Sequence, residues 1–133
     1  MDHKNLKIAS RSENIALVEK LINDVCQTFK INEDHYGNIL VAMTEAVNNA
    51  IQHGNKYNPD KNIDIAFDST KDVVSFTVKD QGEGFDYNHL PDQTDPANIE
   101  KPNGRGVFLM RNLADRVEFL DNGRTVCLDF KIS

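Results

Sequence analysis

The sequence lacks the features that mark membrane, disulfide-bonded and metal-cluster proteins. No apolar run approaches the ~20 residues that a bilayer-spanning helix needs. The two cysteines, Cys26 and Cys127, lie far apart without Cys-x-x-Cys spacing, so free buried thiols are expected, and the four histidines form no metal-binding motif. Residues 1–5 resemble no signal peptide. These absences predict a cytoplasmic protein that has no membrane partner.

Basic residues are also few. The 133 residues hold 15 Lys and Arg against 21 Asp and Glu, a net charge of -6, and no window clusters the basic ones. Nucleic acids and anionic membranes bind clustered Lys and Arg, so we expect neither as a partner. With 39% hydrophobic and 27% charged residues, the length fits one globular domain spanning residues 1–133.

Hydrophobic periodicity predicts an α+β fold. Apolar residues recur at helical spacing up to about Phe29, then in a second helix over about 33–54 that Asn32 starts and Gly54 ends with a left-handed cap. Period-two alternation predicts the remaining strands, and further helical spacing predicts one short helix. The expected segments are strand 6–9, hairpin 63–68 and 74–78, helix 107–114, and an Asn-Gly hairpin of 117–120 with 125–132. This order predicts a two-layer sandwich, with three helices on one face of a mostly antiparallel mixed sheet and a cleft between the second helix and that sheet.

A long polar segment interrupts this pattern. Three of the four prolines, Pro91, Pro96 and Pro102, fall in residues 81–104 together with several glycines, so we expect no regular structure there. Long loops inside small domains tend to be lids or binding segments. We therefore interpret this stretch as a lid.

The second helix carries an unusual polar stripe. Glu45, Asn49 and His53 follow one another at i, i+4 and i+8, on the side opposite the apolar arc. A lone carboxylate and an amide among small alanines suit a ligand. A solvated polar stripe is the alternative, since amphipathic helices commonly carry one. We expect His53 to be structural, favoured as a cation by the helix C-terminus and capping its carbonyls.

Two glycine motifs are expected to face the same cleft. Asp80 ends a strand and precedes Gly82 and Gly84, while residues 104–106 (Gly-Arg-Gly) open the third helix. Glycine lets a backbone approach a flat base or a phosphate closely, and a helix start offers free N–H groups to phosphate oxygens. Asp80 is placed to accept a hydrogen bond from an exocyclic amine. Each motif alone also occurs in ordinary turns; the combination indicates a nucleotide site.

These motifs resemble those of the Bergerat-fold ATPases of the GHKL superfamily, whose histidine-kinase-like ATPase fold is then expected. Within it, the chain resembles the small anti-sigma-factor serine kinases of the RsbW type, over nearly its whole length. The matching segments are Glu45-Ala-Val-Asn-Asn49-Ala-Ile-Gln-His53-Gly54, Asp80-Gln-Gly-Glu-Gly84-Phe and Gly104-Arg-Gly106-Val-Phe-Leu-Met.

The resemblance implies a role for each matching residue. Glu45 would be the general base, Asn49 would bind Mg²⁺ through its amide oxygen, Asp80 would hold the adenine amino group, and residues 86–103 would be the ATP lid. The glycines of the two motifs, namely Gly82, Gly84, Gly104 and Gly106, would contact the nucleotide.

Two further residues near the nucleotide are weighed. Arg105 is the candidate for a charge clamp on the γ-phosphate, whereas Lys101 is interpreted as solvated lid charge. The family commonly has Thr directly after the glycine of the last hairpin, but here Arg124 intervenes. Strand alternation then predicts that the Thr125 hydroxyl lies on the opposite face.

The resemblance predicts a Mg²⁺- and ATP-dependent serine-protein kinase. Its expected partner is a small regulatory protein similar to the anti-anti-sigma (STAS) proteins; a sigma factor and a second copy of the chain stay open as further partners. The kinase would act as an anti-sigma or partner-switching regulator. The alternative is a non-catalytic module that sequesters a regulator when nucleotide is bound. An intact Glu45 favours the enzyme, because a module that only binds needs no base.

Overall fold

The computed structural model describes residues 2–82 and 102–132, without the side chains of 2 and 102–105. The elements follow the predicted order. They are β1 (Asp2–Ala9), α1 (Ile15–Thr28), α2 (Glu33–Asn49), β2 (Asn62–Ser69), β3 (Val73–Lys79), α3 (Pro102–Leu113), β4 (Arg116–Leu120) and β5 (Thr125–Lys131). Short helical turns occupy Ser12–Asn14, Ala50–Gly54 and Asp121–Gly123. In the described ranges no helix is long and apolar enough to cross a membrane.

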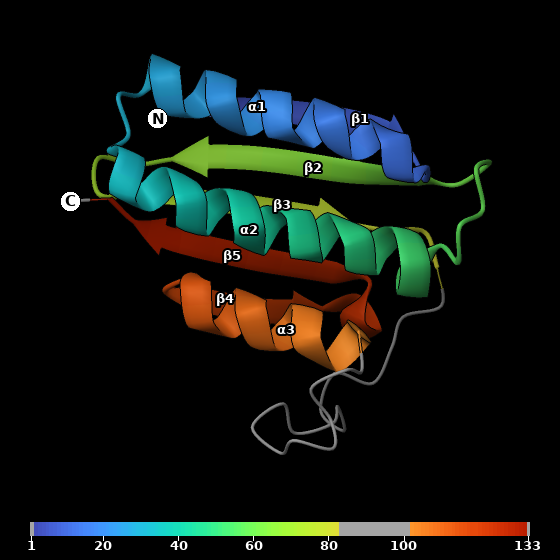
Figure 1. The fold of residues 1–133 in the computed structure, drawn as a ribbon. Helices are drawn as coiled ribbons and strands as arrows, with labels where there is room; N and C mark the ends of the chain where they lie inside the picture. The colour runs from blue at the N-terminus through green and yellow to red at the C-terminus, as the bar shows by residue number, and fades with distance from the viewer. Residues whose placement is uncertain (1, 83–101, 133) are drawn as a thin grey trace.

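The five strands form one sheet in the order β1-β2-β3-β5-β4, and each neighbouring pair is antiparallel. The helices α1, α2 and α3 lie together on one face of this sheet (Figure 1). The predicted two-layer α+β fold is confirmed. Every neighbouring pair is antiparallel, so the sheet is fully antiparallel and not mixed as predicted.

Strand alternation builds the core. Ile63, Ile65 and Phe67 of β2 are 0–1% exposed and face the helices, and Phe67 pairs directly with Phe76 of β3. The rings of Phe67 and Phe76 have centroids 5.2 Å apart, and Phe76 contacts Phe130 of β5 at 6.2 Å. The apolar face of α2 covers this core on the helical side of the sheet. The α2 helix is thus held in place by its buried side, which fixes the direction of its polar side.

The start of α2 is as predicted, but its end is not. The Asp34 backbone N–H donates to Asn32 Oδ1 at 2.9 Å, the expected N-terminal cap. At the other end, the chain continues into a π-helical turn, Ala50–Gly54, closed by the Asn55 N–H donating to the Ala50 carbonyl at 2.8 Å. Left-handed backbone occurs only afterwards, at Lys56 and Tyr57. The prediction of a left-handed cap at Gly54 is therefore wrong.

The third helix begins five residues earlier than predicted. It starts at Pro102, not at 107, so residues 104–106 lie inside its first turns. Proline is favoured at the first helical position because its missing N–H would have had no partner there and its φ is already helical. The prediction that prolines prevent regular structure throughout 81–104 fails at this last proline.

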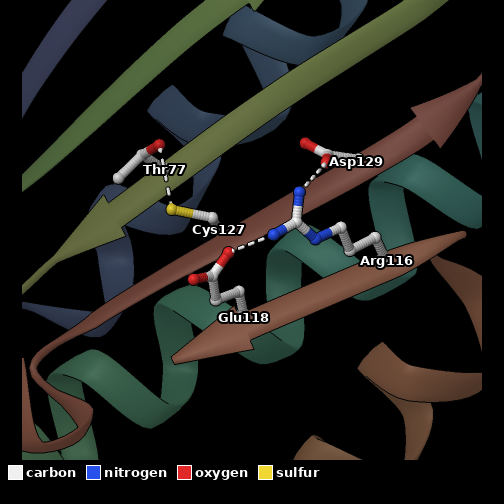
Figure 2. Close-up of polar contacts among 5 residues, drawn as sticks. All are labelled: Thr77, Arg116, Glu118, Cys127 and Asp129. Carbon is white, nitrogen blue, oxygen red and sulfur yellow. Dashed lines mark hydrogen bonds and ion pairs between the residues drawn. The ribbon is translucent and has the colours of Figure 1, made fainter. Parts of the chain in front are cut away.

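The sheet face away from the helices is polar. Figure 2 shows Arg116 of β4 between Glu118 and Asp129, with α2 behind the sheet. Beside them, Thr77 Oγ1 and Cys127 Sγ lie 3.6 Å apart. Cys26 and Cys127 are free thiols, as predicted, with Cys26 buried and Cys127 half-buried. The predicted site residues Glu45 and Asn49 lie on the other side of the sheet, in α2.

Candidate functional site

The polar side of α2 lies against the start of α3. A methyl carbon placed on Gly106 would be 3.1 Å from both amide atoms of Asn49 and 3.2 Å from Glu45 Oε2. A side chain at this position would press on the carboxylate and the amide, which would have to move slightly. The first and third sequence motifs therefore meet in space, although about sixty residues separate them along the chain.

The amide of Asn49 is held in an unusual state. Its Nδ2 is buried and has no hydrogen-bond partner in the part of the chain that the structure describes. Leaving a buried donor unpaired typically costs ~1–3 kcal/mol, so such an atom indicates a group that arrives from outside. An amide oxygen suits Mg²⁺, which takes one or two protein oxygens together with phosphates and waters. The close approach of Gly106 thus brings α3 next to this unpaired amide nitrogen.

Asp80 lies at the end of β3 and is 5% exposed. The Gly82 N–H donates to Asp80 Oδ1 at 2.8 Å, and the Asp80 N–H donates to the Arg124 carbonyl at 2.9 Å. Burial raises the pKa of Asp80, while the Gly82 bond and the charges of Arg124 and Lys61 oppose this rise. The carboxylate is thus fixed in direction and poorly hydrated, the state in which a hydrogen bond from a ligand amine is most favourable.

Two glycines allow residues 80–82, which follow β3, to contact Gly54 at the end of the helical turn after α2. A methyl carbon on Gly54 would lie 2.3 Å from Asp80 Oδ2, and one on Gly82 would lie 1.8 Å from the Gly54 carbonyl oxygen. Neither separation is compatible with a side chain. Gly54 is therefore explained by this close contact and not by a left-handed backbone.

A pocket opens between the helices and the sheet beside Asn49 and Asp80. It is lined by Ala46, Asn49, Ala50, Val78, Asp80, Met110, Phe119, Gly123, Arg124 and Val126. Its walls are mostly apolar, with Asn49, Asp80 and Arg124 as polar groups, a combination that small-molecule sites share. The Phe119 wall is also contacted by Arg111, whose guanidinium carbon lies 5.8 Å from the ring centroid.

The sequence motifs miss half of these walls. Phe119 and Val126 resemble ordinary core residues in the sequence, because their spacing is that of a buried face. Ala46 and Ala50 gave a partial signal for the pocket, because small side chains beside Asn49 leave room along that side of α2. Gly123, with φ of 89°, marks the turn that brings Arg124 to the pocket.

The Thr125 hydroxyl lies away from this pocket, as strand alternation predicts. Thr125 Oγ1 donates to Asp121 Oδ2 at 2.8 Å, and Thr125, which is 6% exposed, pairs with Lys79 of β3. Its neighbour Val126 lines the pocket instead.

His53 is not the cationic cap that we expected. Burial lowers the pKa of His53, and its Nε2 is buried with no hydrogen-bond partner among the described residues. Desolvation outweighs the helix dipole here, because the ring lies partly inside the protein and the dipole acts through a terminal turn only. The expectation of a charged, carbonyl-capping His53 is wrong.

Some predicted residues cannot be placed. Gly84, Lys101 and lid residues 86–101 lie outside the described residues, and the Arg105 side chain does as well. The backbone of 102–105 forms the first turn of α3, where N–H groups have no partner within the helix. The structure thus brings together Glu45, Asn49 and Gly106 at one point and Asp80, Gly82 and Gly54 at another, with the pocket between them.

Comparison with known proteins extends these observations. The family described as histidine kinase-like ATPase domain matches residues 8–130. Serine-protein kinase RsbW of Staphylococcus epidermidis is 28% identical over 135 residues, covering 96% of this chain and 85% of that protein. Serine-protein kinase RsbW of Bacillus cereus (strain Q1) is 29% identical over 130 residues, covering 92% and 81%.

A solved structure shares the fold. The crystal structure of the RsbU and RsbW domains of Rv1364c from Mycobacterium tuberculosis aligns with a TM-score of 0.63 and 12% identity, covering 98% of this chain and 31% of that chain. At this identity the likeness shows the fold alone. The family match over most of the chain, together with the fold, establishes that this protein belongs to the histidine kinase-like ATPases of the GHKL superfamily and is similar to the RsbW serine-protein kinases.

Proposed function

We propose that this protein is a Mg²⁺- and ATP-dependent serine-protein kinase whose substrate is a small regulatory partner similar to the anti-anti-sigma (STAS) proteins. One observation carries the proposal: the Glu45 carboxylate and the Asn49 amide lie together against Gly106 in α3, so the first and third sequence motifs meet at one point. The similarity to proteins named serine-protein kinase RsbW supports it.

Each residue has a defined task in this proposal. Glu45 accepts the proton of the attacking serine hydroxyl, and the Asn49 amide oxygen holds the magnesium ion. Asp80 accepts a hydrogen bond from the adenine amino group, while Gly82 and Gly84 let the backbone approach the base. ATP supplies the phosphoryl group, and Mg²⁺ neutralises its charge.

The start of α3 completes the site. Gly104 and Arg105 lie in its first turn, whose free N–H groups receive phosphate oxygens, and Gly106 lies against Glu45 and Asn49. We assign the Arg105 side chain to the γ-phosphate, where it neutralises charge in the transition state. Residues 86–103 form the ATP lid in this proposal.

The wider setting is part of the same proposal. We infer that residues 1–133 form one cytoplasmic domain acting as an anti-sigma or partner-switching regulator. A sigma factor is a second candidate partner and a second copy of the chain a third. The regulatory role and the partner candidates follow from the resemblance and the similarity to RsbW, whereas the single domain and its location follow from length and composition.

The kinase proposal is tested by capturing partners from the source cells in the presence of Mg-ATP. Mass spectrometry of the captured protein is expected to find a phosphoserine that forms only when ATP and the kinase are both present. ADP serves as the control, because it supports binding and supplies no γ-phosphate. A partner captured repeatedly without a phosphoserine would contradict the enzyme and favour the sequestering module.

Asp80→Asn is expected to weaken ATP binding about tenfold or more, because a hydrogen bond to a charged acceptor is lost. GTP, which lacks the adenine amino group, is expected to bind poorly to both proteins. Calorimetry measures this, and equal affinities of the wild type for ATP and GTP would contradict the role of Asp80.

The same substitution is expected to leave the protein as stable as the wild type or more so at neutral pH. A carboxyl whose pKa is raised on folding stabilises the native state below its ordinary pKa, and this contribution is lost as pH rises through the folded value. Asparagine removes the buried charge and still accepts the Gly82 N–H. Melting temperatures are expected to converge at acidic pH; a lower Tm of the variant at neutral pH only would contradict this account.

Asn49→Ala is expected to remove the Mg²⁺-dependent part of nucleotide affinity, at least the ~10-fold that the loss of a group next to a metal ligand costs. Calorimetry with ATP, with and without Mg²⁺, separates that part. Asn38→Ala is the matched control, since Asn38 is an exposed asparagine of the same helix. A magnesium effect of wild-type size in Asn49→Ala would rule out Asn49 as the ligand.

A further inference from the structure

Asn55 follows the π-helical turn and is 1% exposed, although its side chain is polar. Both ends of its amide are used. Nδ2 donates to the Asn62 carbonyl at 3.0 Å, and Oδ1 accepts the Gln81 backbone N–H at 2.8 Å. Its own N–H donates to the Ala50 carbonyl at 2.8 Å. One buried side chain therefore joins the helical turn after α2 to the start of β2 and to the residue directly after Asp80.

The three joined segments lie at the same end of the molecule. Figure 1 shows the end of the α2 ribbon, the beginning of β2 and the tip of β3 together there. A second bond closes the group, because the Asn62 N–H donates to Gln81 Oε1 at 2.7 Å. The Gln81 side chain is exposed, whereas the Asn55 amide is shielded from water. Of the two connections, the Asn55 one is thus the stronger constraint.

This constraint acts on the carboxylate proposed to contact adenine. The direction of Asp80 depends on the backbone of residues 80–82, because Oδ1 is bonded to the Gly82 N–H and Oδ2 lies against Gly54. Asn55 holds the N–H between those two residues. In the part of the chain that the structure describes, Asn55 has no hydrogen bond to Asn49 or to α3, the groups proposed for the metal and the phosphates.

We propose that Asn55 is a positioning residue that sets base selectivity: by fixing the Gln81 backbone it aims the Asp80 carboxylate at the exocyclic amine of adenine. The inference rests on the proposed nucleotide role of Asp80 and is independent of whether phosphate is transferred. Asn55 touches no nucleotide itself; it acts through Asp80.

Asn55→Ala leaves the Gln81 N–H and the Asn62 carbonyl unpaired. The expected result is a fall of about 5- to 100-fold in the ratio of ATP affinity to GTP affinity, with the magnesium dependence of ATP binding unchanged. Calorimetry with both nucleotides measures the ratio, which a general loss of stability would not change selectively. Asn58→Ala is the matched control: Asn58 lies in the same loop and is exposed, and its side chain accepts the Asp60 N–H at 3.0 Å.

Asn55→Asp provides an independent arm that also serves if the alanine variant does not fold. The carboxylate still accepts the Gln81 N–H and loses the bond to the Asn62 carbonyl, so the ratio is expected to fall by about 2- to 10-fold only. A wild-type ratio in either folded variant would overturn the role of Asn55. Equal affinities in the wild type would overturn the role of Asp80, and with it this inference. Failure of phosphoryl transfer alone leaves the selectivity result standing.

Discussion

Glu45→Gln is expected to slow phosphoryl transfer by ~10²- to 10⁴-fold, the usual cost of losing a positioned general base. The substitution keeps the size and shape of the side chain and removes its ability to take a proton. Because Glu45 acts on the attacking hydroxyl and not on the nucleotide, the affinities for Mg-ATP and for the partner are expected to stay close to wild type. Single-turnover transfer of labelled γ-phosphate measures the rate, and calorimetry measures the affinity.

The same helix offers a matched control. Glu33 is an exposed carboxylate in the first turn of α2, far from Gly106 along the helix axis, and Glu33→Gln is expected to transfer phosphate at the wild-type rate. If Glu45→Gln transfers phosphate as fast as the Glu33 variant, Glu45 is not the base. The sequestering module would then be the better account of the intact nucleotide pocket.

Gly82→Ala is expected to have the largest effect on stability and to abolish adenine binding. The added methyl would lie 1.8 Å from the Gly54 carbonyl oxygen, a backbone atom that cannot rotate away. Overpacking against movable side chains typically costs ~1–3 kcal/mol, so we expect a loss in the free energy of unfolding at or above the upper end of that range. The loop that moves to relieve the contact carries Asp80 with it. Urea unfolding and ATP calorimetry test the two effects.

Gly37→Ala is the control for adding a methyl to a glycine. Gly37 lies inside α2, and a methyl carbon there would meet no atom within 4 Å. Alanine in a helix is more stable than glycine by ~0.5–1 kcal/mol, so this variant is expected to be slightly more stable and to bind ATP normally. A Gly82→Ala protein as stable as Gly37→Ala would contradict the close contact between the Asp80 loop and Gly54.

The arrangement of helices and strands was predictable because each element has a clean period. The alternation at Ile63, Ile65 and Phe67 identifies a half-buried strand, and the capped, amphipathic stretch after Asn32 identifies a long helix. These local patterns agree with the tertiary packing, so nothing competes with them. The polar stripe of Glu45 and Asn49 was also visible, since helical spacing alone puts both on one side.

Other parts of the site depend on contacts between distant residues and leave no local signal. The glycine at 54 was expected to permit a left-handed cap, yet its reason is the carboxylate of Asp80, which lies 26 positions further along the chain. Asn55 resembles an ordinary loop asparagine until Gln81 is placed beside it. Phe119 resembles a core residue until the pocket is formed. Such roles come from tertiary proximity, which periodicity does not encode.

The start of α3 illustrates a competition between two local rules. Proline ends regular structure inside an element and begins it at the first helical position. The prediction of no regular structure at Pro102 rests on the first rule, whereas the structure follows the second and begins α3 there. The result places Gly104 and Arg105 in the first turn of the helix.

The most direct test of the central claim, that three distant segments form one Mg-ATP site, is the crystal structure of the protein with Mg²⁺ and a non-hydrolysable ATP analogue. We expect the adenine amino group within hydrogen-bond distance of Asp80 and the metal on the Asn49 amide oxygen. The phosphates are expected at the first turn of α3, close to Gly106. A nucleotide bound elsewhere, or bound in this pocket with its metal away from Asn49 and its base away from Asp80, would contradict the account.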